Sequence, residues 1–283
     1  MKRVPASCVW FLLASIASAQ DGGKPAEQPT QPPAKQPETK QPEIKPVESK
    51  PAETKSPPTD DLPSAESLFE KHIAAVGGME ALKAERNRVV RATYSDGMRA
   101  ADGQLRVLRV APNKYYSKLE LPGVMTRETW CNAEGAWVRD SNTGSVRLTG
   151  EALSESRMQA EFMGESGYKT RYKEVSTIGR EKLNGADVFV VLATPAEGKP
   201  RRVFFDATTG LIAGIRHPSP AGPEMDPVTT YSDYKKFGDI MHPTRSVTRI
   251  GKTEVAVIIF SKIESNLSVM PSVDPPDEIK AIK

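Results

Sequence analysis

The chain is poor in the residues that build disulfide frameworks and metal centres. Its 283 residues include two cysteines, Cys8 and Cys131, and three histidines. Two cysteines exclude a disulfide scaffold and a cysteine-based zinc site. Three histidines leave little material for a histidine-rich metal centre. The sequence therefore predicts neither a bound metal nor a cofactor.

The chain also lacks a large excess of charge of one sign. The 39 basic and 36 acidic residues nearly cancel, leaving a formal net charge of +3. Proteins that bind nucleic acids usually carry a basic block or face. The pair Arg201-Arg202 is too short to form one, and we expect it to lie at a solvated strand edge. The composition therefore predicts no nucleic-acid partner.

Long apolar runs are missing, and the most apolar stretch lies at the N-terminus. Lys2 and Arg3 precede a mostly apolar segment from Cys8 to Ile16, which ends before the small residues of Ala17-Ser18-Ala19. The segment is about half as long as a membrane-spanning helix. This pattern predicts that residues 1–19 are a signal peptide, removed on export, and that the mature chain has no transmembrane segment. An uncleaved N-terminal anchor is the alternative.

The next part of the chain lacks the apolar residues needed for a core. Eleven of the protein's 24 prolines lie between Pro25 and Pro63, in a loose repeat of proline, glutamate and lysine. Such a segment cannot bury enough surface to offset the entropy lost on ordering. We expect residues 20–63 to form a disordered linker and residues 64–283 to form one domain.

A helix is predicted at the start of that domain. Ser64 is a suitable N-cap, and Glu66 lies in the first turn, where the helix dipole favours an acidic residue. Gly77-Gly78 ends the pattern. The apolar residues of this segment fall on one helical face, and they are Ala65, Leu68, Phe69, Ile73 and Val76.

The rest of the domain reads as short strands separated by turn residues, Val228–Phe237 and Met241–Ile250 among them, with one helix predicted over residues 150–163. Asn184-Gly185 is a strong hairpin signal. Sequential short strands with tight turns favour an antiparallel meander, so the fold class is mainly β (α+β). Val188–Ala193 and Val255–Phe260 are apolar on both faces. Their second face must contact a helix, a ligand or a partner.

Motifs for catalysis are weak. Gly164-Glu-Ser-Gly167 is similar to a nucleophile elbow, but Tyr168 replaces the final glycine and the segment follows a predicted helix. Cys131 could act with a histidine as a nucleophile, but its neighbour Trp130 favours a place in the core. We therefore expect the protein not to be an enzyme, and the hypothesis of a hydrolase has almost no support.

The order of the elements resembles the periplasmic lipoprotein-carrier superfamily, the outer-membrane lipoprotein-sorting (LolA-like) proteins. Four segments carry the resemblance: an opening helix, a central hairpin with glycine at its turn, a late hairpin ending in Thr-Gly-Leu, and the terminal strands. They are Leu68–Gly78 with Ala81-Leu82, Asn132–Asp140, Phe204–Leu211, and Tyr234–Gly238 with Pro243 and Asn266. The resemblance covers about Ala65 to Pro276.

This resemblance implies an unclosed antiparallel β-barrel, or curved half-barrel, with a helical lid and an apolar concavity that receives acyl chains. The leading hypothesis is an exported, non-enzymatic carrier or binder of lipid or lipoprotein acyl chains in the periplasm or cell envelope. The alternative is an interaction or sensory module that binds an envelope protein through a strand edge. The predicted ligand-binding residues of the cavity or lid are Phe69, Ile73, Val76, Met158, Phe162 and Met163.

Overall fold

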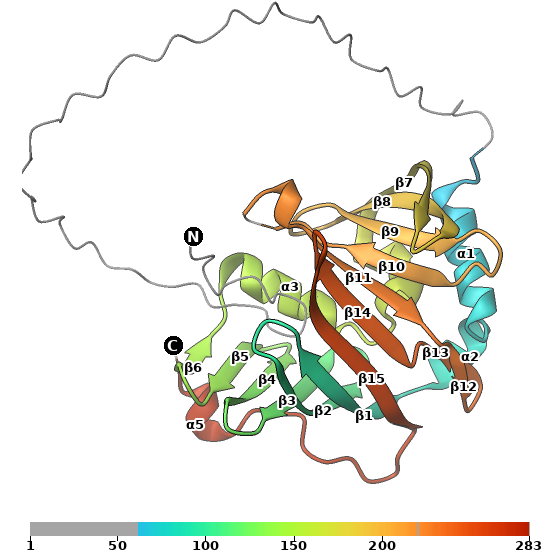
Figure 1. Ribbon diagram of the computed structural model, residues 1–283. Helices are drawn as coiled ribbons and strands as arrows, with labels where there is room; N and C mark the ends of the chain where they lie inside the picture. Colours follow the sequence, from blue (N-terminus) through green and yellow to red (C-terminus); the bar gives the residue numbers. More distant parts are fainter. Residues whose placement is uncertain (1–61, 220, 283) are drawn as a thin grey trace, which may run out of the picture.

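The computed structural model describes residues 62–219 and 221–282, so the predicted signal peptide and nearly all of the predicted linker lie outside the described residues. The dominant feature is one antiparallel sheet of 13 strands (Figure 1). Its strands are β1 Asn87–Asp96, β2 Ala101–Val110, β3 Lys114–Leu121, β4 Met125–Asn132, β5 Gly135–Asp140, β6 Gly144–Arg147, β7 Tyr172–Leu183, β8 Ala186–Pro195, β9 Arg201–Asp206, β10 Ile212–Arg216, β11 Pro227–Ser232, β14 Arg245–Ile250 and β15 Thr253–Ser265. A separate two-stranded sheet pairs β12 Lys235–Phe237 with β13 Ile240–His242.

The strand order brings the two ends of the domain together. It runs β6-β5-β4-β3-β2-β1-β15-β14-β11-β10-β9-β8-β7, so the first strand pairs with the last at the middle of the sheet. The outermost strands, β6 and β7, do not pair with each other. The sheet is therefore curved but not closed, which confirms the predicted half-barrel.

The first and third helices cover the concave side of the sheet (Figure 1). One apolar cluster joins the first helix to β8, β9 and β10, and a second joins β1 to β5 with the third helix. The helices are α1 Ala65–Ala75, α2 Gly78–Ala84, α3 Gly150–Ala160, η2 Gly164–Gly167, α4 Tyr168–Arg171, η3 Pro223–Met225 and α5 Asp277–Lys280.

Local sequence sets the limits of α1. The Ser64 hydroxyl accepts a hydrogen bond from the Ser67 amide at 3.2 Å, as expected for an N-cap. At the other end, Gly77 has a φ of +127°, and a Cβ there would lie 2.3 Å from the carbonyl oxygen of Asp239. Only glycine allows this close approach, which holds the end of α1 against the turn between β12 and β13.

Two late segments differ from the sequence prediction. Residues 228–237 and 241–250 each read as one strand, but each is divided between the large and the small sheet. Asp233 breaks the first because it adopts a left-handed conformation with a φ of +56°. Pro243 follows β13 in the second and lacks a donor for the ladder. The β12–β13 hairpin therefore leaves the main sheet and reaches the end of α1, where the Met241 amide donates to the Val76 carbonyl.

The C-terminal segment lies on the convex face of the sheet. Val273 packs against Val89 and Leu108, and Ile279 of α5 packs against Trp130 and Trp137. This segment covers the outer face of β1 to β5, so the lid and the cavity lie on the other side.

Candidate functional site

A cavity of about 440 Å³ lies between the middle of the sheet and the helices that cover it. Its volume falls in the range of ~300–1,000 Å³ that is typical of small-molecule sites. The floor comes from β1, β2 and β15, and part of the cover comes from α3 and the turn that follows it. The segment at residues 164–166 and the end of α1 close two further sides.

The floor is apolar over most of its length, and the strand register explains why. Inward-facing residues of β1 stand directly opposite inward-facing residues of β2 and β15, so they form rows across the concave face. Three successive rows are Val107–Val90–Ile263, Leu105–Ala92–Phe260 and Gly103–Tyr94–Ile258. All but Ala92 and Gly103 line the cavity.

The structure brings four of the six predicted ligand-binding residues together at the cavity. Val76 lies at the end of α1, Met158 is on α3, and Phe162 and Met163 are in the turn after α3. The predicted helix over 150–163 ends at Ala160, so Phe162 and Met163 reach the cavity from the turn rather than from a helical face. The contact of these four residues with a ligand stays a prediction.

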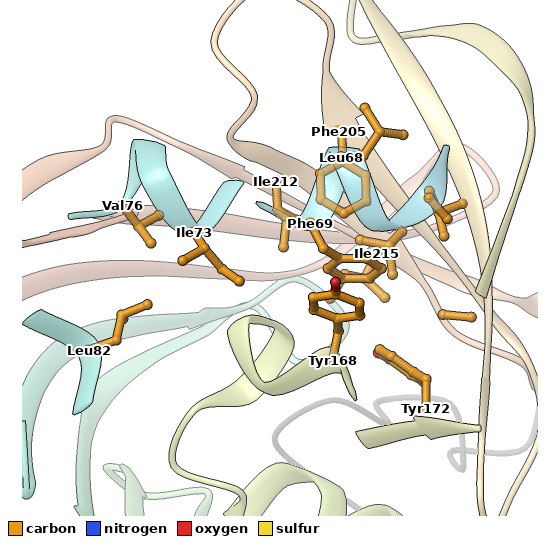
Figure 2. Packing of buried hydrophobic residues seen from close by; sticks show 14 of the residues in the cluster. Leu68, Phe69, Ile73, Val76, Leu82, Tyr168, Tyr172, Phe205, Ile212 and Ile215 are labelled. Carbon is orange, nitrogen blue, oxygen red and sulfur yellow. The ribbon is translucent and has the colours of Figure 1, made fainter. Parts of the chain in front are cut away.

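The other two predicted residues do not line the cavity. Phe69 and Ile73 are buried in the apolar cluster beneath α1 (Figure 2). The Phe69 ring stacks on Tyr168 with centroids 4.4 Å apart, and it meets Phe205 edge-on at 4.9 Å. This geometry is typical of a packed aromatic core. Phe69 is therefore placed to hold α1 on the sheet rather than to contact a molecule in the cavity.

A buried arginine fastens the cover. Arg171 donates through Nη1 to the carbonyl oxygen of Met158 and to Glu161 Oε2, both at 2.7 Å. Its Nε lies 3.3 Å from Glu165 Oε1, and the Tyr172 hydroxyl donates to the same carboxylate group. The side chain of Arg171 is only 7% exposed. One cation thus ties the end of α3 to the start of the following turn, in the manner of a charge-assisted network.

A second buried pair lies where α3 crosses β9. Arg201 donates to Glu155 Oε1 at 2.9 Å, and its Nη1 lies 3.5 Å from Nδ1 of His217. The Arg201 side chain is 2% exposed. The sequence predicts a solvated strand edge for the pair Arg201-Arg202. That interpretation is wrong, because Arg201 faces inward and pairs with a carboxylate more than forty positions earlier in the chain.

The sites considered for catalysis are structural. Cys131 is free and buried, and burial raises the pKa of its thiol to about 11, so the reactive thiolate is scarce. Gly164–Gly167 forms a 3₁₀ turn between two helices and not a strand-to-helix elbow. Within the described residues, no group of three or more His, Cys, Asp or Glu side chains is placed to hold a metal ion.

Histidines at the cavity are held neutral. Burial lowers the pKa of His72 to about 4, against weaker opposing effects of Glu165 and of a hydrogen bond to the Gly210 backbone. Burial likewise lowers the pKa of His242 to about 4, and the pKa of His217 falls well below its ordinary value. Protonation of these rings therefore opposes folding.

We expect His72 to reduce stability as the pH falls from about 6.5 to 4. The unfolded chain binds a proton at the ordinary histidine pKa, whereas the folded chain does so only near pH 4. From pH 7 to pH 5 this lowers the free energy of unfolding by about 1–2 kcal/mol. Urea unfolding at both pH values measures the change. The variant His72→Gln should show a smaller loss, and an equal loss would contradict the assignment.

Comparisons with known proteins agree with this architecture. A LolA superfamily protein from Nitrosomonas europaea aligns with a TM-score of 0.51 and 15% identity, over 77% of this chain and 97% of that chain. A DUF1329 family protein from Desulfovibrio piger aligns with a TM-score of 0.51 and 11% identity, over 72% and 94%. The fold is that of LolA superfamily proteins. No protein-family model matches the chain, and no curated protein matches it by sequence.

Two of the LolA-like segments quoted from the sequence span hairpin turns in the structure. Asn132–Asp140 runs from the end of β4 through the turn into β5, and Phe204–Leu211 spans the turn from β9 to β10. The predicted resemblance is confirmed at the level of the fold. Among the helices of the described residues, none is long and apolar enough to cross a membrane.

Proposed function

We propose that this protein is a non-enzymatic binder or carrier of acyl chains, from a lipid or a lipoprotein, in the cell envelope. The observation that carries the proposal is the apolar floor of the cavity over β1, β2 and β15, covered by α3 and its following turn. Burial of each methylene group there would contribute ~0.8 kcal/mol. Met158 and Met163 would adapt to different chains, since methionine side chains are flexible.

The predicted leader and linker fit the same proposal. Residues 1–19 would direct export, and residues 20–63 would tether the domain while letting it reach the envelope around it. The fold of the domain is shared with LolA superfamily proteins. The periplasm or cell envelope is therefore the proposed location.

Filling the cavity should weaken ligand binding. Ile258 and Ile259 are neighbours on β15, but Ile258 lines the cavity whereas Ile259 points outward and is 50% exposed. We expect Ile258→Trp to weaken binding of a fluorescent fatty acyl probe by about tenfold, because the larger side chain would displace about two methylene groups of the probe. At ~0.8 kcal/mol each, their loss is ~1.6 kcal/mol, and ~1.4 kcal/mol corresponds to tenfold. Ile259→Trp is the matched control and should bind normally.

Probe titration with both variants, after a thermal melt confirms that they fold, tests the proposal. Equal affinity of Ile258→Trp and the unmodified chain would place the probe outside this cavity. Absence of binding by the unmodified chain would remove the proposed function.

The alternative is an interaction or sensory module that binds a protein partner. It is supported by β7, a strand of 12 residues at one end of the sheet, and by Ile178 on it, which is 45% exposed. A strand at a sheet edge can pair with a strand of another chain. Capture of an envelope protein by lipid-free protein, abolished by Ile178→Lys, would favour this alternative.

A further inference from the structure

One end of the cavity floor is cationic. The register that forms the apolar rows also places Arg88 of β1 directly opposite Arg109 of β2, in the row next to Val90 and Val107. Both arginines line the cavity. The concave face therefore changes from charged to apolar along the strands, as the binding surface for an amphiphile would.

The two arginines differ in their partners. Arg88 forms an ion pair with Glu85. Arg109 has no carboxylate within 4 Å among the residues that the structure describes. Its Nη1 lies 3.3 Å from the carbonyl oxygen of Glu161, and its guanidinium lies 5.3 Å from the centroid of the Tyr115 ring. Most of the donors of Arg109 thus have no strong acceptor.

Each carboxylate that lines the cavity is already paired. Glu85 pairs with Arg88, and Glu155 pairs with Arg201. The remaining two, Glu161 and Glu165, both pair with Arg171. Arg109 is therefore the one arginine of the described cavity lining without an acidic partner. Burial, together with smaller effects of Arg88 and Arg171, lowers its pKa to about 10, which agrees with a cation whose counter-charge is missing.

We propose that the cavity takes a single-chain amphiphile with an anionic headgroup, a carboxylate or a phosphate, whose headgroup binds Arg109 and whose chain lies over the rows toward Tyr94 and Ile258. This inference rests on the proposed function. From Arg88 to Tyr94 the strand runs six residues, about 20 Å at ~3.3 Å per residue. At ~30 Å³ for each small group, the cavity of about 440 Å³ holds on the order of fifteen non-hydrogen atoms, which is one chain with its headgroup.

Arginine suits this role. Its planar fork binds the two oxygens of a carboxylate or phosphate at once. The contact of Arg109 with the Glu161 carbonyl is long for such a donor, so an anion would compete with it readily. Because Phe162 and Met163 follow Glu161, the headgroup would lie beneath the turn that closes the cavity.

The test compares dodecanoate, 1-dodecanol and acetate by displacement of a fluorescent acyl probe. Dodecanoate and dodecanol share a chain and differ in the charge of the head, and acetate is the headgroup alone. We expect dodecanoate to bind at least tenfold more tightly than dodecanol, and acetate not to compete. Equal binding of dodecanoate and dodecanol would overturn the inference and leave the proposed function standing. If neither binds, the proposed function fails with it. Competition by acetate at equal strength would show a plain anion site and would also overturn the inference.

Variants assign the headgroup to Arg109. In Arg109→Gln the preference for dodecanoate over dodecanol should fall at least fivefold, with dodecanol binding unchanged, while Arg109→Lys should keep part of the preference. The control is Arg106→Gln, because Arg106 is on the same strand but on the opposite face, and its preference should not change. An unchanged preference in Arg109→Gln would overturn the assignment.

A measurement on the unmodified chain covers the case in which Arg109→Gln does not fold. Dodecanoate labelled with ¹³C at its carboxyl group reports its own titration by NMR. A guanidinium beside the carboxylate lowers its pKa, whereas apolar burial raises it. We expect the bound pKa to be lower than the pKa of free dodecanoate. A raised pKa would place the headgroup away from Arg109 and overturn the inference.

Discussion

Replacement of Arg171 by methionine is expected to lower the free energy of unfolding by ~3–5 kcal/mol. The guanidinium is buried, and its loss would leave Glu161, Glu165 and the Met158 carbonyl without their shared donor. Methionine fills much of the same volume, so the loss reports the uncompensated carboxylates rather than a void. Urea unfolding, monitored by tryptophan fluorescence and by circular dichroism, measures it.

Two further variants sharpen this prediction. Arg202→Met is the matched control, because Arg202 is exposed and forms no ion pair in the described part of the chain, so it should change stability by no more than ~0.5 kcal/mol. Arg171→Lys keeps the charge but loses the planar fork, so its free energy of unfolding should lie between that of Arg171→Met and that of the unmodified chain. A loss below about 1 kcal/mol for Arg171→Met would mean that the network is solvated and does not fasten the cover.

The elements that the sequence predicted well depend on local signals. The cap at Ser64, the apolar face of α1 and the Gly77-Gly78 stop all lie within one short segment, and the structure reproduces them. Strands bounded by strong turn residues were also located well, with Asn184-Gly185 forming the turn between β7 and β8. These features need no knowledge of what lies across the sheet.

The two strands that are apolar on both faces have different explanations. On β15, Ile258 and Phe260 face the cavity, as expected for a surface that meets a ligand space. On β8, Val188 and Val190 point away from α1 and pack with Phe204, and Leu183 from the end strand β7 packs against the same cluster. The end of the sheet at β7 therefore curls over and covers the outer face of β8. Composition cannot distinguish these cases, because the curvature depends on the whole sheet.

The polar end of the cavity could not be predicted for a similar reason. Arg88 and Arg109 are far from exceptional in the sequence, and only the β1–β2 register brings them opposite each other. A shift of one residue in this pairing would move one of the two to the convex face. Arg171 and Glu165 are close in sequence, but their ion pair is strengthened by burial under α1 and α3. No local sequence pattern reveals this burial.

Phe69→Ala is expected to cost ~3–5 kcal/mol of unfolding free energy, the range for a large aromatic residue removed from a well-packed core. Phe69 has no exposed surface, and its ring contacts Tyr168 and Phe205. Aromatic pairing adds to the loss beyond the buried area. Thermal or urea unfolding measures it, with Glu66→Ala on the exposed side of the same helix as control.

The same variant separates a core role from a ligand role. Because Phe69 does not line the cavity, its removal should leave the affinity for an acyl probe unchanged once the folded fraction is taken into account. Phe162→Ala should do the reverse, since Phe162 lines the cavity from a turn: the probe should bind several-fold more weakly, with a smaller loss of stability than for Phe69→Ala. If Phe69→Ala instead cost less than about 1 kcal/mol and abolished probe binding, the acyl chain would lie beneath α1 itself, and the cavity over β1, β2 and β15 would not be the binding site.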